Sequence, residues 1–528
     1  MSLLLVVVLL FFSSSCSVSS GQYYVSDDCS SVTQSPCNPL SVYAGNMSQY
    51  NNTIFYFIGT TYIRYYVVTM TAVMNVTLHG LDQSPSINCN GASKTSILVY
   101  YSNDATISNI LFSDCSLEIH SSNNITIANS SFIRSKSGTL QLYNAFDVKI
   151  SSSLYNGYKI DIQYDPLPVC SDELPHYSLI LTNVNLTQLP DAGEMQLVIN
   201  NGNSYNVSII IDHLYSAQCF SLELFESIFN FFIIKSSFHN NTFSIGFYIN
   251  FGEYSSPTKC SYPVITLASN VILIEESQLY KNWHGFQITT DKYLPGTVDY
   301  HIIIKSCLMH DNEAGLFIDA TFLRFLQIDI INTQFIGNGG NKIMNSNAIS
   351  LSNVTVANST YTGLTLERSL VTIKDDLIFK NNTGVVGGGL AINDSSVLIV
   401  SSSANLEFTD NHASYKGGGI YLEESTYSNT KLMTPNIPLT LINNSAGLVG
   451  GDTYGMACYQ FNLTNPHISS TGNPVSLCFC DLHAINITKS CFYVSKQHIH
   501  PGQTLQYYVA LLGYDYFGSL TPTDGTVQ

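Results

Sequence analysis

Short stretches of alternating apolar and polar residues recur along this chain, and many of them end in the same way. In the full pattern, aliphatic residues are followed by a polar pair, an apolar residue and an asparagine. The full pattern occurs at 233–241, 272–282, 302–312 and 328–338, its second half at 379–382 and 408–411, and its first half at 125–132. Alternation with a period of two predicts short strands, and the Asn, Gly and Ser residues between them predict turns.

The asparagines that close these segments follow one another at intervals of 41, 30, 26, 44 and 29 residues. A period of about 20–30 residues with insertions is typical of a solenoid. One coil cannot bury its apolar face alone, whereas coils stacked about 4.8 Å apart place equivalent residues above one another. Inward aliphatic and phenylalanine side chains would then fill a narrow core, and asparagines at a coil corner would form a hydrogen-bonded ladder. The expected ladder residues are Asn241, Asn282, Asn312, Asn338, Asn382, Asn411 and Asn444.

Three asparagine doublets support this register: Asn240-Asn241, Asn381-Asn382 and Asn443-Asn444. In each doublet the first residue is an Asn-x-Ser/Thr glycosylation acceptor, and the second aligns with the ladder. A glycan cannot enter a protein core, so the acceptor and the ladder residue have to be different asparagines. Leucine-rich repeats are the rival solenoid, but their Leu and Asn spacing is missing here.

Composition narrows the classes of partner. The chain of 528 residues has 20 Lys and Arg against 37 Asp and Glu, a formal net charge of −17. This balance disfavours nucleic acid as a partner, because there is no basic surface to neutralise phosphates. The 34 Tyr and 27 Phe disfavour a disordered chain. With Ser, Thr and Asn as the main solubilising residues, the composition indicates an all-β protein.

The beginning of the chain predicts export. Residues 1–20 resemble a secretory signal peptide, with an apolar run at 3–12 and small residues after it. No later stretch reaches the roughly 18 apolar residues of a transmembrane helix, so no transmembrane segment is predicted. Removal of Cys16 leaves an even number of the 13 cysteines, which suits an oxidising compartment. We therefore expect a secreted, extracellular protein, or one at the cell surface if the chain is part of a longer protein.

Glycosylation acceptors agree with export. Their number predicts a heavily glycosylated protein, although some matches arise by chance in an Asn-rich chain. The acceptors are Asn46, Asn51, Asn75, Asn124, Asn129, Asn185, Asn206, Asn240, Asn353, Asn358, Asn381, Asn393, Asn443, Asn462 and Asn486.

Cysteine spacing predicts local bridges. Cys29 and Cys37 lie eight residues apart in a Ser/Pro-rich loop. Cys89 and Cys115 lie 26 apart, about one coil, and can be vertical neighbours within bridging distance. The remaining connectivity cannot be deduced from the sequence, and further candidate pairs are Cys480 with Cys491 and Cys458 with Cys478. No cysteine pair has zinc-ligand spacing, and neither a metal site nor a cofactor is predicted.

At the repeats, the sequence resembles a right-handed parallel β-helix of the pectin-lyase-like superfamily. Within 379–455 it is similar to the repeats of polymorphic outer membrane proteins, in which Phe-x-x-Asn precedes a Gly-Gly pair. Phe379 to Asn382 precedes the glycines at 387–389, and Phe408 to Asn411 precedes those at 417–419. The expected fold class is therefore all-β, a right-handed parallel β-helix, with the start of a small C-terminal β-domain.

The whole chain also resembles large secreted or surface β-helix proteins of simple animals. This resemblance implies an N-terminal cap with Cys29 and Cys37 and a Cys-rich cap after the helix. The expected domains are a signal peptide at 1–20, an N-terminal cap with the first coils at 21–88, a parallel β-helix at 89–457, a Cys-rich C-terminal cap at 458–491, and the start of a further, truncated β-domain at 492–528.

Catalytic residues are not predicted. Enzymes of the superfamily act on acidic polysaccharides with arginine or lysine bases or with paired aspartates. None of the four arginines lies in a lyase-like context, and Asp375-Asp376 lacks the Asn-Thr-Asp partner of a hydrolase, since 332–334 reads Asn-Thr-Gln. Trp283, with nearby Tyr280 and Tyr293, could stack on a sugar ring, although packing of these rings under a loop is the favoured interpretation.

Three functions remain open. The first is a non-enzymatic β-solenoid glycoprotein for adhesion, matrix structure or glycan contact, whose partners are carbohydrates or extracellular matrix and cell-surface proteins. The second is a polysaccharide lyase or glycoside hydrolase with divergent residues. The third is the ectodomain fragment of a membrane receptor. The missing catalytic patterns favour the first.

Overall fold

In the residues that the computed structural model describes, nearly all regular structure is strand, and the helical elements are α2 (Leu40–Ala44) and two 3-10 turns, η1 (Cys29–Ser31) and η2 (Met47–Gln49). It describes residues 21–454, 468–470, 509–514 and 520–527, with gaps at 46, 65, 82–84, 90–95, 135–137, 165–175, 188–196, 202–205, 218–221, 226–228, 242, 250–269, 291–299, 322–325, 424–430, 433–438 and 449–450. The predicted signal peptide at 1–20 lies outside the described residues.

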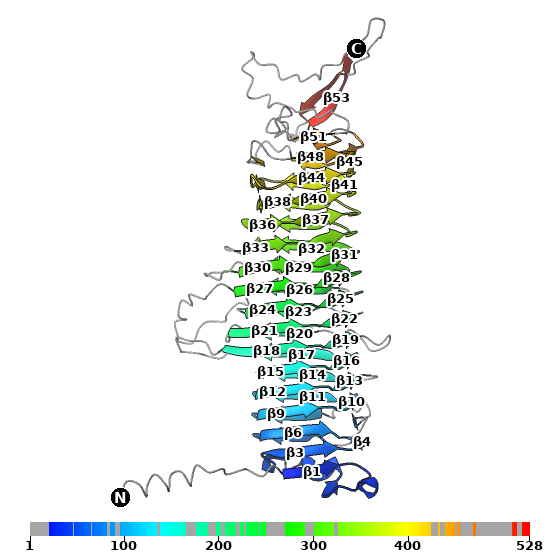
Figure 1. Cartoon of the computed structure of the whole chain (residues 1–528), viewed down its shortest axis with the longest axis vertical. Coiled ribbons are helices and arrows are strands. Elements are labelled where there is room, and N and C mark those ends of the chain that lie inside the picture. The colour runs from blue at the N-terminus through cyan, green and yellow to red at the C-terminus, as the bar shows by residue number, and fades with distance from the viewer. Residues whose placement is uncertain are drawn as a thin grey trace, which may run out of the picture. The chain divides into compact units, whose positions relative to one another are not determined.

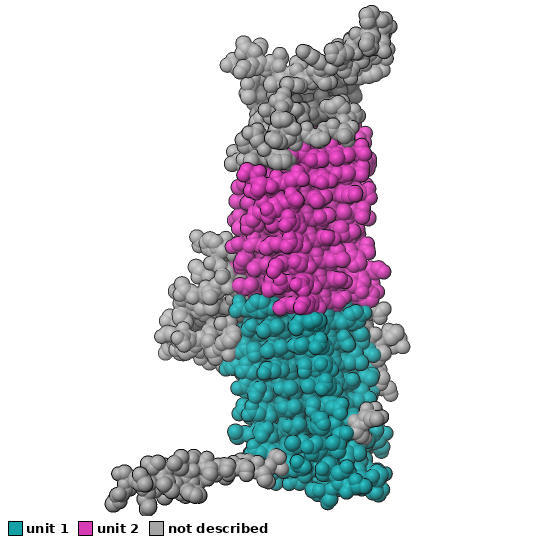
Figure 2. Space-filling model, in the orientation of Figure 1, with its two compact units in different colours: residues 1–232, 254–263 teal, residues 233–253, 264–528 magenta. Residues whose placement is uncertain are grey.

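The chain forms two compact units, coloured separately in Figure 2. In unit 1 (1–232 and 254–263), successive coils each add a strand to three sheets, here called A, B and C, and neighbouring strands of a sheet pair in parallel. Sheet A has β1 (Gly21–Val25), β2 (Cys37–Asn38), β3 (Thr53–Phe57), β6 (Met74–Gly80), β9 (Asn103–Ser108), β12 (Asn123–Ala128), β15 (Phe146–Ser151), β18 (His176–Thr182) and β21 (Asn206–Asp212). Sheet B has β4 (Thr60–Tyr62), β7 (Ser86–Asn88), β10 (Leu111–Ser113), β13 (Ser131–Ile133), β16 (Leu154–Asn156), β19 (Asn185–Thr187) and β22 (Tyr215–Ala217). Sheet C has β5 (Val68–Thr71), β8 (Ser96–Tyr100), β11 (Ser116–His120), β14 (Thr139–Tyr143), β17 (Lys159–Tyr164), β20 (Leu197–Asn201) and β23 (Leu222–Phe225).

Unit 2 (233–253 and 264–528) repeats the same coil, and β24 (Phe229–Ile234) includes residues of both ranges. Its sheet A has β27 (Asn270–Glu275), β30 (Tyr300–Lys305), β33 (Leu326–Ile331), β36 (Ala348–Ser352), β39 (Leu370–Ile373), β43 (Val397–Val400) and β47 (Lys431–Leu432). Its sheet B has β25 (Ser237–His239), β28 (Gln278–Tyr280), β31 (Leu308–His310), β34 (Gln334–Ile336), β37 (Val354–Ala357), β40 (Leu377–Lys380), β44 (Leu406–Thr409), β48 (Leu439–Ile442) and β51 (Ile468–Ser470). Its sheet C has β26 (Phe243–Ile249), β29 (His284–Thr290), β32 (Ala314–Asp319), β35 (Asn341–Met344), β38 (Leu364–Glu367), β42 (Leu390–Asn393), β46 (Ile420–Leu422) and β50 (Thr453–Tyr454). A fourth sheet, D, has β41 (Thr383–Val386), β45 (His412–Lys416) and β49 (Ser445–Ala446).

Stacked side chains fill the core of each unit. The strands alternate buried and outward residues, and the in-register pairing puts like above like. Phe132 lies between Phe112 and Tyr155, with ring centroids 4.7 and 4.6 Å away, and Phe379 stacks on Phe408 at 4.9 Å. The chain is therefore all-β and forms the right-handed parallel β-helix that the sequence predicts, with its coils visible in Figure 1.

Most coil corners share a two-residue unit: a residue with positive φ, followed by a buried residue. At the turn from sheet C to sheet A, Arg368 has φ +45° and is followed by buried Ser369. The Ser369 amide donates to Ser396 Oγ at 3.1 Å, and the Ser346 amide donates to Ser369 Oγ at 3.3 Å. These serine side chains accept hydrogen bonds from corner amides, and no sequence pattern distinguishes them because Ser is abundant throughout the chain.

The triple glycines after the Phe-x-x-Asn segments have a steric reason. Gly387 and Gly417 have φ of +60° and +67°, where a side chain is unfavourable. A Cβ on Gly388 would lie only 2.4 Å from the carbonyl oxygens of Gly418 and His412. Between β41 and β42, the backbone at Gly388 therefore lies so close to the backbone of the next coil that a side chain has no room.

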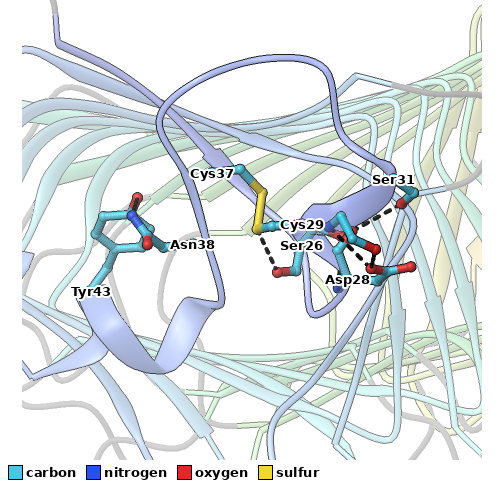
Figure 3. Close-up of a disulfide and its surroundings, with 8 residues drawn as sticks. Ser26, Asp28, Cys29, Ser31, Cys37, Asn38 and Tyr43 are labelled. Carbon is cyan, nitrogen blue, oxygen red and sulfur yellow. Dashed lines mark hydrogen bonds between the residues drawn. A yellow bond between two sulfur atoms is a disulfide. The ribbon is translucent and has the colours of Figure 1, made fainter.

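Two of the expected disulfides are present. Figure 3 shows the Cys29–Cys37 bridge between η1 and β2, where Cys29 Sγ lies 3.4 Å from Ser26 O. Cys89 bridges to Cys115 in the next coil across a Cα–Cα distance of 5.0 Å, as one-coil spacing predicts. The candidates Cys458, Cys478, Cys480 and Cys491 lie outside the described residues.

Within the region 492–528, β52 (Val509–Tyr514) and β53 (Leu520–Val527) form an antiparallel pair. The antiparallel pairing distinguishes these two strands from the parallel strands of sheets A to D. Among the helices of the described residues, none has the length and apolar character that crossing a membrane requires.

Candidate functional site

A ladder of buried asparagines runs along unit 2 at the turn from sheet B to sheet C, which we call the B–C corner. Asn312 is 2% exposed, and its Nδ2 donates to Leu279 O at 2.9 Å and to Asn338 Oδ1 at 3.0 Å. Its Oδ1 accepts from both the amide and the Nδ2 of Asn282, at 3.0 and 2.9 Å. Asn241 extends this run, since its amide donates to Asn282 Oδ1 at 2.9 Å. The side chains of Asn282, Asn312 and Asn338 thus each satisfy one carbonyl and one amide of the preceding coil.

The ladder consists of two runs. Asn382, Asn411 and Asn444 form the second run with the same geometry. Between the runs, the equivalent position is Ser359, whose amide donates to Asn382 Oδ1 at 3.0 Å. This substitution could not be predicted from the sequence, because the Phe-x-x-Asn signal is absent from that coil. At the other end, Asn444 Nδ2 donates to Asp452 Oδ1 at 3.0 Å.

The residues after the ladder form a second, outward column. The amide of Trp283 donates to Asn241 O, that of Glu313 to Asn282 O, and that of Gly339 to Asn312 O, at 2.8–3.0 Å. The column continues through Thr360, Thr383, His412 and Ser445, each bonded in the same way to the ladder residue of the preceding coil. We call this set the corner column. Rigid backbone bonds fix each of its members at one height along the corner.

An open groove of about 580 Å³ lies on this corner. Two aromatic side chains border it, Trp283 at 55% and Tyr361 at 64% exposed. The corner column needs glycine at position 339, because a Cβ there would lie 1.7 Å from Glu313 O of the preceding coil. The lining of this aromatic groove is Asn240, Asn241, Lys281, Asn282, Trp283, Asp311, Asn312, Glu313, Gly337, Gly339, Thr360 and Tyr361.

The charges in the groove are mostly acidic. Asp311 and Glu313 oppose a single cation, Lys281, among the lining residues. Asp311 Oδ2 lies 3.0 Å from His310 Nδ1. Burial lowers the pKa of neighbouring His284, against the opposing effect of the Glu313 charge, so this imidazole stays neutral at pH 7. The groove can offer aromatic faces and carboxylate acceptors for hydroxyl groups, and it is unsuited to polyanions.

The three aromatic residues expected to act together do not form one platform. The favoured interpretation was that Trp283 packs under a loop. Among the described residues, Trp283 is instead an exposed side chain that lines the groove. Tyr280 instead stacks between His239 and His310 on sheet B, at centroid distances of 4.7 and 4.9 Å. Tyr293 lies outside the described residues. Tyr361, from a coil three windings later, was missed because no sequence signal connects it with Trp283.

Glycosylation acceptors gather at the coil corners. Asn240, Asn358, Asn381 and Asn443 occupy the position before the buried ladder residue, with φ of +51° to +57°. In the groove, this position is taken by Lys281, Asp311 and Gly337. Acceptors that are exposed are Asn51, Asn75, Asn124, Asn129, Asn185, Asn240, Asn353, Asn358, Asn381 and Asn443. Asn393 is half-buried, and Asn46, Asn462, Asn486 and the Asn206 side chain lie outside the described residues.

No metal-binding cluster is found in the part of the chain that the structure describes. It contains no group of three or more His, Cys, Asp or Glu side chains arranged to hold a metal ion. Asp375 accepts from Ser352 Oγ at 2.5 Å, and Asp376 O accepts from the Val354 amide at 3.0 Å. This aspartate pair therefore has a structural role in a turn. The free thiol Cys307 is buried, and burial raises its pKa to about 11.

Asp329 forms the most buried ionic cluster on sheet A. It is 8% exposed, and its Oδ2 lies 2.7 Å from His301 Nε2 and accepts from Gln327 Nε2 at 3.0 Å. Lys374 Nζ lies 3.5 Å from its Oδ1. Burial raises the pKa of Asp329, but the hydrogen bond with His301 and the Lys374 charge outweigh it, and the pKa lies below its ordinary value of 3.8.

The Asp329 carboxylate should make stability depend on pH. Because its pKa is lower in the folded state, the charged form stabilises the fold above pH 4, and this contribution is lost as the pH falls further. Asp329→Asn should lower the free energy of unfolding at pH 7 by about 2 kcal/mol and flatten the loss between pH 5 and 3. Urea unfolding across this range measures both effects. Exposed Asp376→Asn is the control, and an equal change there would contradict the assignment.

Comparison with known proteins gives no family for this chain. No protein-family model matches the sequence, and no curated protein matches it. Among solved structures, the A-module of the mannuronan C-5 epimerase AlgE4 from Azotobacter vinelandii shares 11% identity over 71% of this chain and 91% of its own, with a TM-score of 0.30. Tailspike protein 3 of bacteriophage CBA120 shares 12% over 72% and 54%, with a TM-score of 0.24. The AlgE6 A-module of A. vinelandii shares 11% over 79% and 91%, with a TM-score of 0.23. Similarities this weak carry no argument about function.

Proposed function

We propose that this chain is a secreted or cell-surface glycoprotein whose β-solenoid binds glycans without chemical turnover, and that the aromatic groove is the binding site. The observation that carries the proposal is the exposure of Trp283 and Tyr361 on one groove whose polar lining consists mainly of carboxylates and amides. An exposed indole face suits the C–H face of a pyranose ring, and carboxylates accept hydrogen bonds from its hydroxyl groups.

Three further observations support the proposal. The two disulfides favour an oxidising compartment. The exposed acceptors agree with an extracellular glycoprotein. Lys281 is the single cation among the lining residues and lies with two carboxylates, so the groove offers little net positive charge to a uronate substrate. The lyase, hydrolase and receptor alternatives have no comparable observation in their favour.

Trp283 allows a direct test because it is the single tryptophan of the chain. The secreted protein is titrated with neutral, amino-sugar and uronate oligosaccharides while the tryptophan emission is recorded. We expect a saturable change with neutral sugars and none with uronates. In calorimetry, Trp283→Ala should weaken binding by about tenfold or more, the effect of one aromatic contact of about 1.4 kcal/mol.

The control is Tyr101→Ala, which removes an equally exposed ring from unit 1. Unchanged binding by Trp283→Ala would show that the groove is not the site. New reducing ends or unsaturated uronates after incubation, with or without Ca²⁺, would replace the non-enzymatic proposal with an enzyme.

A further inference from the structure

An exposed apolar stripe continues from the aromatic groove along sheet D. It consists of Tyr361, Val385, Tyr415 and Leu448, which are 64, 62, 43 and 52% exposed. Thr362 Oγ1 donates to Val386 O at 2.8 Å, Val386 pairs with Lys416, and the Leu448 amide donates to Tyr415 O at 2.9 Å. The four side chains therefore belong to consecutive coils, one above another. Tyr361 belongs to both the groove and the stripe.

Large side chains seldom remain exposed in a row without a partner. No member of the stripe carries a charge, so a charged polymer gains nothing there. Lys416 is 9% exposed and lies beneath the stripe, with its Nζ 5.1 Å from the Tyr415 ring and 4.5 Å from the Tyr454 ring. These contacts hold the Tyr415 ring in place, so that it is presented at a fixed height.

Coil spacing sets the distances between the aromatic rings. The corner column passes from Trp283 through Glu313, Gly339, Thr360 and Thr383 to His412, the coil that holds Tyr415. These five steps amount to about 24 Å at the ordinary strand spacing. One step is close to the length of one sugar unit in an extended chain, so a linear glycan that lies along the corner can place a sugar ring against each aromatic side chain.

We propose that the ligand is a linear chain of neutral pyranose units that lies along the B–C corner, stacking on Trp283, Tyr361 and Tyr415 in turn. This inference rests on the proposed function and adds the polymer class and its direction. The carboxylates Asp311 and Glu313 exclude uronates at the first contact, and the uncharged stripe matches the neutral chain beyond it.

The test uses the full secreted protein and a size series of neutral β-1,4-linked oligosaccharides from two to eight units. Affinity, measured by tryptophan emission and calorimetry, should rise with length up to about six units and then level off, since the platform spans about five coil steps. Tyr415→Ala should weaken binding of the six-unit chain by about fivefold and leave two-unit binding unchanged. Tyr101→Ala serves again as the matched control.

The outcomes separate the two proposals. Failure of every sugar to bind would overturn the proposed function. Equal affinity for short and long chains, with no effect of Tyr415→Ala, would overturn this inference and leave the groove as a site for a short glycan. Length-dependent binding that appears only after enzymatic removal of N-glycans would also overturn it, because sugars on Asn358 or Asn381 would then cover the stripe.

Discussion

Asn312→Asp should destabilise unit 2 by about 3–5 kcal/mol, the usual cost of leaving a buried charge without compensation. The substitution replaces the Nδ2 donor with an oxygen that faces two acceptors, Leu279 O and Asn338 Oδ1. Water cannot satisfy the site, because Asn312 is 2% exposed. Urea unfolding gives the free energy, and hydrogen exchange of the corner amides in residues 282–338 locates the loss.

Asn332→Asp is the matched control for Asn312→Asp. Asn332 is exposed at the turn from sheet A to sheet B, and its Oδ1 accepts from Asn353 Nδ2 at 3.0 Å, a bond that aspartate retains. We expect a change within about 0.5 kcal/mol, as for surface positions generally. Similar losses from the two variants would mean that the ladder adds nothing beyond an ordinary surface hydrogen bond.

Phe132→Ala should cost unit 1 about 3–5 kcal/mol, because it removes a fully buried ring and leaves a cavity that the stack cannot close. The ring is 0% exposed and has Phe112, Tyr155 and Tyr158 around it, with centroids at 4.7, 4.6 and 5.5 Å. Tyr158 in turn donates its hydroxyl to Cys115 O at 2.7 Å. The cavity therefore loosens a buried hydrogen bond as well.

Thermal and urea unfolding measure the Phe132→Ala effect. Val42→Ala shortens an apolar side chain that is 57% exposed in α2, and it should change stability by less than about 0.5 kcal/mol. A loss at Phe132 no larger than that at Val42 would show that the stacked rings do not carry the stability of the coil.

The repeat pattern predicted the fold because the pattern and the fold have the same cause. A coil that cannot bury its own apolar face needs equivalent residues in the next coil, and this need appears in the sequence as recurring Ile, Phe and Asn. Asn312 and Asn411 could be placed for this reason, and so could the one-coil bridge from Cys89 to Cys115. Where the pattern changes, as at Ser359, the sequence did not predict which residue occupies the ladder position.

The candidate site was only partly predictable. The sequence offered Trp283 as a residue that could stack on a sugar ring together with Tyr280 and Tyr293, but Tyr280 stacks instead with His239 and His310. Tyr361 follows Trp283 by 78 positions in the sequence, and no residue pattern links the two. Only the stacking of coils brings both rings to one groove.

The sequence by itself determined the strand period, the parallel β-helix, the buried asparagines and the acceptors beside them, because each follows from a local rule repeated in every coil. The tertiary structure decided which outward residues are neighbours. Side chains on the outer face obey no burial rule, and the lengths of the coils between them vary, so their alignment depends on how many residues each winding takes. The groove and the stripe of unit 2 are products of that alignment.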